Sequence, residues 1–252
     1  MRRLRNIFLL MVGLGGLTAV SFFFLSRLFS RLLERGTSDE VLFHADTRQK
    51  VIALTIDDGP HAELTPEILD VLAELQVRAT FFIIGSQVPG NEDVMRRLVR
   101  EGHELGNHLM DDQRSITLDA DEFARQLATA HALISPYGPV HWFRPGSGFY
   151  NARMLEQIRP FHYRCVVGSV YPYDAQFHSV EFATGYILGN VQPGAIIVLH
   201  DGDCERQGTV EILRRIIPAL QKRGYRFLTL SALAHIADRQ SMRQDGLVLE
   251  IP

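Results

Sequence analysis

The sequence predicts an α/β fold in which about seven parallel strands alternate with helices. From Val51 onward, short apolar runs alternate with longer stretches of helical periodicity. Residues 51–54 and 195–199 are apolar at consecutive positions, as in strands that are covered on both faces. Repeated strand–helix alternation is typical of a parallel sheet, which is either closed into a barrel or open and doubly wound.

The individual elements follow from local periodicity. We expect strands at 51–56, 79–84, 103–108, 142–144, 163–168, 195–199 and 226–230. We expect helices at 65–75, 91–101, 118–134, 151–157, 183–190 and 209–223. Apolar residues in the first helix recur every three or four positions, at Ile68, Val71, Leu72 and Leu75. That spacing places them on one face, which would pack against the sheet.

The N-terminal region differs in composition from the rest. Positions 7–26 are uncharged and mostly apolar, which is long enough for a helix to cross the ~30 Å core of a bilayer. We expect one transmembrane signal-anchor helix, with a cleaved signal peptide as the alternative, although no small-x-small site follows. A slight excess of positive charge before the span favours a cytoplasmic N-terminus. The domain would then be extracytoplasmic, or secreted if the segment is cleaved. The predicted organisation is an anchor at 1–26, a spacer at 27–48 and one α/β domain at 49–252.

Charge and cysteine content exclude some classes of protein. Residues 1–36 carry six arginines and one glutamate, which is +5, so the total of −3 leaves −8 for the rest. An acidic body argues against binding of nucleic acid, because phosphate contacts need clustered positive charge. Cys165 and Cys204 are expected near opposite ends of their strands, too far apart for a disulfide, so we expect free thiols.

Ionisable residues follow the carboxyl ends of most predicted strands. They are Asp57, Asp58, His108, Arg144, Asp174 and His200. In a parallel β/α architecture these ends share one face, and active sites gather there. We therefore expect the six residues to converge on one site.

A metal site is predicted near His108. His108 and Asp112 are four residues apart, so on a helical turn they would share a face and could bind one ion. Asp58 would supply a third ligand, and Asp111 competes with Asp112 for its role. One imidazole and two carboxylates suit Zn²⁺, with Co²⁺ or another divalent ion as alternatives.

Two further positions suit acid–base and electrostatic catalysis. Arg144 begins a loop at 144–148 in which the guanidinium could hold a carboxylate ionised and backbone N–H groups could receive an oxyanion. His200 ends a buried strand, which is a good position for a general acid. We expect His103 to be structural and Trp142 to lie in the core or in a groove wall.

Together these segments resemble the polysaccharide deacetylase family, also called the NodB-homology domain or carbohydrate esterase family 4. The resemblance covers roughly residues 50–235, and five motifs occur in family order, at 55–60, 108–113, 144–148, 171–175 and 198–200. Asp112 stands where the family has a second ligand histidine, and Ala175 stands where it has a tryptophan. The family fold is a distorted (β/α) barrel with about seven strands.

The resemblance implies a role for each matched residue. The proton-transfer residues would be Asp57 as general base, Arg144 as its partner, His200 as general acid and Asp174 as its partner. The metal ligands would be Asp58, His108 and Asp112. The residues around the acetyl group would be Ser147, through its backbone N–H, and Leu199, in the acetyl pocket.

The activity that the resemblance implies is hydrolysis of acetyl groups. The expected substrate is the N-acetylglucosamine units of a polysaccharide such as chitin or peptidoglycan, and the reaction would depend on a metal and release acetate. The second and fourth motifs are altered. An O-acetyl sugar esterase and an inactive carbohydrate-binding relative therefore remain alternatives.

Overall fold

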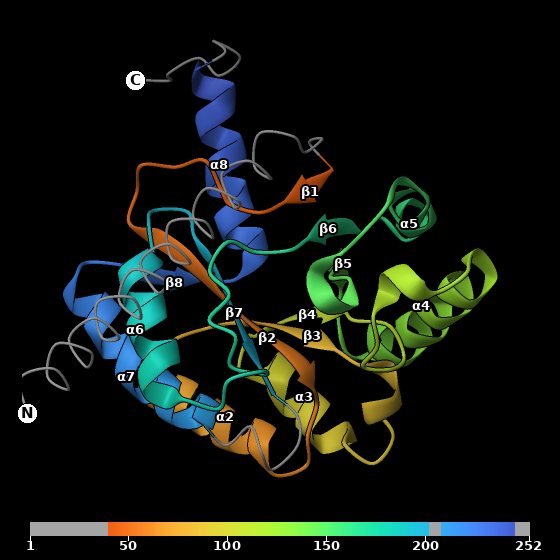
Figure 1. Ribbon diagram of the computed structural model, residues 1–252, viewed down its shortest axis with the longest axis horizontal. Helices are drawn as coiled ribbons and strands as arrows, with labels where there is room; N and C mark the ends of the chain where they lie inside the picture. The colour runs from red at the N-terminus through yellow and green to blue at the C-terminus, as the bar shows by residue number, and fades with distance from the viewer. Residues whose placement is uncertain (1–39, 202–207, 245–252) are drawn as a thin grey trace, which may run out of the picture. The chain divides into compact units, whose positions relative to one another are not determined.

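The computed structural model describes residues 40–201 and 208–244, the last five of these by backbone alone (Figure 1). The predicted anchor, most of the predicted spacer and Cys204 lie outside these residues. Among residues 40–201 and 208–244, every helix is too short or too polar to span a bilayer.

The described domain is built on one curled sheet in which every strand pair is parallel. Its strands are β1 (Val41–Leu42), β2 (Val51–Gly59), β3 (Thr80–Ile83), β4 (Glu104–Asn107), β5 (Val140–Phe143), β6 (Arg164–Val166), β7 (Ile196–His200) and β8 (Arg226–Leu228). Seven of them follow the order β1-β6-β5-β4-β3-β2-β7. Strand β8 pairs with the beginning of β2. It lies on the side of β2 opposite β7, since Ala53 pairs with Ile196 of β7 and also with Leu228 of β8. The sheet forms half of a barrel, which agrees with the predicted architecture.

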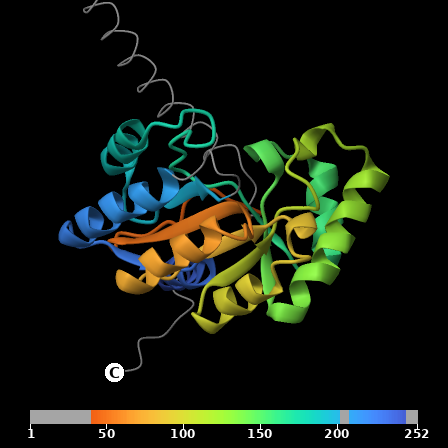
Figure 2. The same ribbon diagram turned by 90° about the horizontal axis from the view of Figure 1, so that it is seen from below.

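Helices cover the outer face of this sheet. They are α2 (Leu64–Glu74), α3 (Glu92–Arg100), α4 (Ala120–Ile134), α5 (Ala152–Ile158), α6 (Val180–Asn190) and α7 (Gly208–Lys222), whereas α8 (Leu230–Gln244) packs on β2 from the other face. Helices α6, α7, α2 and α3 are neighbours in that order (Figures 1 and 2). The alternation of strand and helix in the chain thus produces a two-layer domain.

Strand β2 shows how the two faces of the sheet differ. Its outward residues belong to the main hydrophobic core under the helices, and they are Ile52, Leu54 and Ile56. Its first inward residues belong to a smaller cluster with α8, which contains Val51, Ala53, Leu230 and Leu233. The next inward residues are Thr55 and Asp57, which are polar and buried. The inside of the half-barrel is therefore filled with apolar side chains at its amino end and polar ones at its carboxyl end.

Among the described strands and α-helices, β1 and α8 were not predicted from the sequence. Strand β1 lies within the stretch predicted as a spacer, and Val41 pairs with Cys165 of β6. A two-residue strand has no detectable period, so only the pairing with β6 reveals it. Helix α8 carries apolar residues at Leu230, Leu233 and Ala234, a helical spacing that could have predicted it.

His103 and Trp142 both lie in the interior. The Nδ1 atom of His103 accepts a hydrogen bond from Ala79 N at 3.1 Å, and burial lowers the pKa of His103 to about 4. Trp142 is buried on the inward face with the α8 cluster, and its Nε1 donates to Glu104 Oε1 at 3.1 Å and to Ser231 Oγ at 3.0 Å. None of these hydrogen bonds joins His103 or Trp142 to the polar residues at the carboxyl end of the sheet.

Candidate active site

Asp57 and Arg144 form a buried ion pair at the carboxyl end of the sheet. Arg144 follows β5, and its Nη1 donates to Asp57 Oδ1 at 2.5 Å and to Thr55 Oγ1 at 2.7 Å. Asp57 is 3% exposed and Arg144 is 2% exposed, so solvent screens their attraction only weakly. The guanidinium carbon lies 4.1 Å from the centroid of the Phe82 ring, a cation–π contact. The arginine thus compensates the buried carboxylate charge and fixes its orientation.

A bulge in β2 brings the neighbouring carboxylate to the same site. The register between β2 and β3 shifts between Asp57 and Gly59, so Asp58 is the extra residue. Asp58 has a φ of 73°, a left-handed conformation that a regular strand does not contain. In a regular strand Asp57 and Asp58 would point to opposite faces. With the bulge, Asp58 Oδ1 lies 3.4 Å from His108 Nε2 while Asp57 contacts Arg144.

His108 follows β4, and its orientation is set through its other ring nitrogen. Nδ1 lies 2.7 Å from the carbonyl oxygen of Arg144, which can only accept, so Nδ1 carries a hydrogen and donates it. Burial acts to lower the pKa of His108. The hydrogen bond to Asp58 and the charges of Asp57 and Asp58 outweigh burial and raise that pKa. The other ring nitrogen, Nε2, faces Asp58. A metal-binding histidine usually has this arrangement, in which one ring nitrogen donates to a carbonyl oxygen and the other is left for the ion.

The predicted metal ligands are only partly brought together. Asp58 and His108 fit a divalent ion as two buried, adjacent ligands. Asp111 and Asp112 are both exposed. Across residues 40–201 and 208–239, no group of three or more histidine, cysteine, aspartate or glutamate side chains is arranged to hold an ion. The choice between Asp111 and Asp112 as a third ligand stays a prediction.

Asp174 and His200 form a second buried pair. Asp174 lies between β6 and α6, and its two carboxylate oxygens accept from Nδ1 and from the backbone N of His200, each at 2.9 Å. Burial acts to lower the pKa of His200, but Asp174 raises it, with smaller contributions from Asp57 and Asp58, to about 9. His200 is the register partner of Asp57 on the neighbouring strand. A protonated imidazole and a carboxylate therefore lie on adjacent strands.

Ser147 lies in the turn that follows Arg144. It is exposed and has a φ of 65°. The preceding Gly146 donates its backbone N–H to Ser115 Oγ at 2.7 Å. A Cβ at position 146 would lie 2.0 Å from the carbonyl oxygen of Gln113, so only glycine permits this contact. The loop that follows His108 thus packs directly on the turn, and the oxyanion role of Ser147 remains a prediction.

Leu199 lies apart from these polar residues. It precedes His200 on β7, so strand alternation turns it to the opposite face. It is fully buried and belongs to the main core under the helices. Its predicted role in an acetyl pocket is therefore not supported by a contact within the site.

Sequence reasoning did not assign a function to Tyr171, which lies next to His200. Its hydroxyl is 3.5 Å from His200 Nε2, and it accepts a hydrogen bond from Gln176 Nε2 at 3.1 Å. The Tyr171 ring meets the imidazole edge to face, with centroids 5.4 Å apart. Burial raises the pKa of Tyr171 to about 12, so it stays protonated at neutral pH. No local sequence pattern marks this residue, because its contact depends on the path of the loop after β6.

Asp201 and Phe82 were also missed. Asp201 is fully buried, accepts a hydrogen bond from Thr65 Oγ1 and donates its N–H to the carbonyl of Asp57 at 2.7 Å. Phe82 lies beneath Arg144 and close to His108, and it reaches this place across Gly106, where a Cβ would lie 2.5 Å from its ring. In the sequence, Asp201 could have been noticed as an acid directly after His200. Phe82 could have been noticed because alternation along its strand turns it to the inner face.

Comparison with known proteins agrees with this geometry, in which a carboxylate and a histidine with buried partners lie at the carboxyl ends of paired parallel strands. The family model "Polysaccharide deacetylase" matches residues 44–166. Over 197 residues the chain is 33% identical to a peptidoglycan-N-acetylglucosamine deacetylase of Bacillus cereus, which covers 77% of this chain and 92% of that protein. It is 36% identical to a chitooligosaccharide deacetylase of Sinorhizobium fredii over 69% of this chain and 87% of that one. The chain therefore belongs to the polysaccharide deacetylase family, a family of hydrolases.

Solved structures show the same relationship. A peptidoglycan N-acetylglucosamine deacetylase in complex with a benzamide ligand has a TM-score of 0.73 and 31% identity, covering 77% of this chain and 92% of that one. A carbohydrate esterase family 4 pseudoenzyme from Bacillus anthracis has a TM-score of 0.72 and 26% identity over 79% of this chain and 70% of that one. A mutant of that pseudoenzyme has restored enzymatic activity.

Proposed function

We propose that this protein hydrolyses the acetamide of N-acetylglucosamine units in a polysaccharide of the peptidoglycan or chitin type. The observation that carries the proposal is the juxtaposition of Asp57 and His200, which are register partners on β2 and β7. Each is held by a buried partner of opposite charge, Arg144 and Asp174 respectively. The named activities of the relatives support the same substrate class.

The chain's own residues supply the proton transfers. Asp57 accepts a proton from the attacking water as the water oxygen bonds to the acetyl carbon. His200, which is protonated below about pH 9, gives its proton to the amine nitrogen as the carbon–nitrogen bond breaks. The backbone N–H of Ser147 would stabilise the negative charge that develops on the acetyl oxygen. Acetate and a free glucosamine amine are the products.

We also propose that Asp58 and His108 hold a divalent ion, with zinc as the first candidate and cobalt as the second. Asp112, or Asp111 in its place, would be the third ligand. When bound, such an ion would polarise the acetamide carbonyl and lower the pKa of a water molecule. The purified protein should contain about one ion per chain by elemental analysis, and a metal content near zero after growth with zinc and cobalt would count against this site.

The activity is tested by acetate release. Full-length protein should release acetate and an equal amount of free amine from N-acetylglucosamine oligomers or peptidoglycan. His200→Ala should reduce the rate by roughly 10²–10⁴-fold, the usual range for loss of a general acid. No acetate from any of these substrates, with the metal supplied, would sink the proposal.

Acetylated xylan distinguishes the proposed deacetylase from the main alternative, an O-acetyl sugar esterase. Preferential release of acetate from xylan without free amine would identify an O-acetyl esterase. An inactive carbohydrate-binding relative is less well supported, because the base, the acid and both of their buried partners are present together. Such an inactive relative would bind the oligomers without releasing acetate.

For its location, we propose that residues 7–26 anchor the protein in a bilayer with the domain on the extracytoplasmic side. The support is the uncharged, apolar composition of this segment. Cell fractionation followed by protease treatment of intact cells is the test. Recovery of the full-length chain in the soluble cytoplasmic fraction would contradict the anchor.

A further inference from the structure

A row of five aromatic side chains leads away from His200 along the segment between β6 and α6 and onto α6 itself. Its members are Tyr171, Tyr173, Phe177, Phe182 and Tyr186, and the last four form a closed cluster because Tyr186 also contacts Tyr173, with centroids 6.0 Å apart. Tyr171 contacts His200 at a centroid distance of 5.4 Å, and the following rings lie 5.2 to 6.2 Å apart. The row therefore connects the candidate active site to the surface of the domain.

Two members of this row are exposed. Phe177 is 56% exposed and Phe182 is 41% exposed, whereas the three tyrosines are partly buried. Burying a phenylalanine removes a large apolar surface from water and stabilises a protein, so two adjacent exposed rings forgo that gain. A contiguous exposed aromatic patch beside an active site indicates binding of a ligand.

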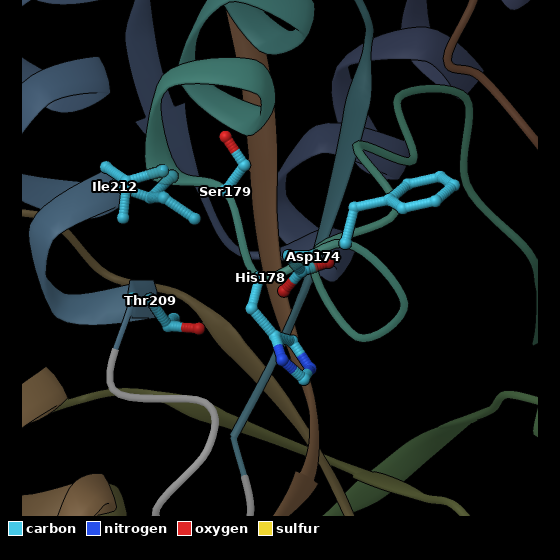
Figure 3. A pocket seen from close by; sticks show the side chains of 8 residues that line it. Asp174, His178, Ser179, Thr209 and Ile212 are labelled. Carbon is cyan, nitrogen blue, oxygen red and sulfur yellow. The ribbon is translucent and has the colours of Figure 1, made fainter.

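Polar groups border the same patch. A pocket beside Phe177 is also lined by Asp174, His178, Ser179 and Thr209 (Figure 3). The exposed His178 projects from the loop before α6, while Thr209 comes from the first turn of α7. A sugar ring has an apolar face of C–H groups and a rim of hydroxyls. Aromatic rings with hydrogen-bonding side chains beside them match both features.

We propose that Phe177 and Phe182, with His178 beside them, form a subsite for another sugar unit of the polysaccharide whose acetamide reaches His200. This inference rests on the proposed function. The row of ring contacts makes the patch continuous with the site, so one extended chain could occupy both.

The test is calorimetric binding of a dimer and a hexamer of N-acetylglucosamine to the full-length protein. The double variant Phe177→Leu/Phe182→Leu keeps apolar bulk but loses both rings. It should bind the hexamer about tenfold more weakly, because the contacts of both rings with the sugar are lost, and should bind the dimer unchanged. Phe177→Tyr/Phe182→Tyr keeps the rings and should bind both ligands as the wild type does.

A matched control is Phe149→Leu, because Phe149 is 57% exposed and lies outside the row of rings. Its binding of the hexamer should not change. Equal hexamer affinity in the wild type and the Leu double variant would overturn the subsite, as would equal losses for dimer and hexamer. Unchanged sugar binding with weaker binding to anionic vesicles would assign the patch to a membrane instead. Hexamer binding that depends on the rings but yields no acetate would contradict the proposed function and leave the subsite standing.

Discussion

Asp57 contacts Arg144 and Asp174 contacts His200, whereas Asp58 and His108 form a pair whose predicted third partner, Asp112, is exposed. The first half of the site is complete in side chains alone, since every charge has a buried partner. The second half gathers a carboxylate and an imidazole nitrogen, which are the two kinds of ligand that a divalent ion accepts. The base and the acid lie on paired strands, whereas the predicted third ligand lies in a loop.

The two halves of the site differ because one lies on paired strands and the other depends in part on a loop. Asp57 and His200 lie on paired strands, where backbone hydrogen bonds determine which residues face each other. Asp112 lies in the loop after β4, whose path depends on its contacts with other loops. One of these is the close approach of the Gln113 backbone carbonyl to Gly146, which admits no side chain at position 146. A side chain on this loop is therefore positioned less firmly than a side chain on a paired strand.

The largest expected effect concerns the buried ion pair of the first half. Arg144→Ala leaves Asp57 charged and buried without compensation, and should lower the free energy of unfolding by about 3–5 kcal/mol. The exposed pair of Arg125 and Glu122 provides the control, because Arg125→Ala should cost less than about 1 kcal/mol. Urea denaturation followed by circular dichroism measures both. Similar losses in the two variants would mean that the buried pair of Asp57 and Arg144 contributes no more to stability than a surface ion pair does.

The second prediction concerns the pH dependence set by Asp174. His200 is protonated at neutral pH because its pKa lies near 9, so acetate release should fall as pH rises through about 9. Asp174→Asn removes the main cause that raises this pKa, while burial still lowers it. The alkaline limb should then move down by roughly 1–3 pH units.

The same shift has a consequence for stability. Since the pKa of His200 is raised on folding from 6.5 to about 9, its contribution is fully present below pH 6.5 and is lost as pH rises through about 9. Asp174→Asn should flatten the change in unfolding free energy across this window, whereas the exposed Asp46→Asn should not. An unchanged rate profile and an unchanged stability profile would contradict the pairing.

A third prediction decides between two neighbouring acids in the second half. Asp112→Ala should weaken binding of zinc by at least roughly 10–100-fold, the loss typical even for a residue that supports a ligand. Asp111→Ala is the matched control and should bind zinc normally, and Asp112→His should retain binding. Titration with a competing chelator measures all three. The opposite order would identify Asp111 as the ligand, and no effect from either would leave Asp58 and His108 as the only ligands of the four residues considered.

The smallest expected effect concerns the contact between the loop and the turn. Gly146→Ala places a methyl group against the Gln113 carbonyl and should lower the free energy of unfolding by about 1–3 kcal/mol. Gly185, in α6, has open space around it, so Gly185→Ala should be neutral or stabilise by up to about 1 kcal/mol. Thermal unfolding of the two variants measures the difference. A Gly146→Ala protein as stable as the wild type would show that the loop moves freely and is not held by this turn.

Much of the fold could be predicted because the relevant patterns are local. The strand–helix alternation from β2 to β8 and the helical spacing in α2 are visible in short windows of sequence. Strand β1 could not be found in this way, because its two residues have meaning only beside β6. The contact of Tyr171 with His200 was missed for a similar reason, since a loop residue's neighbours are set by distant elements.

That ionisable residues follow the carboxyl ends of parallel strands can be read from the sequence, because the order of residues along each strand is a local property. Which of these residues contact one another depends on the folded chain. The bulge at Asp58 separates two adjacent carboxylates so that Asp57 contacts Arg144 and Asp58 faces His108. Strand parity turns Leu199 into the core while His200 enters the site. Register and bulges depend on hydrogen bonds between segments far apart in the chain, and no short window of sequence contains them.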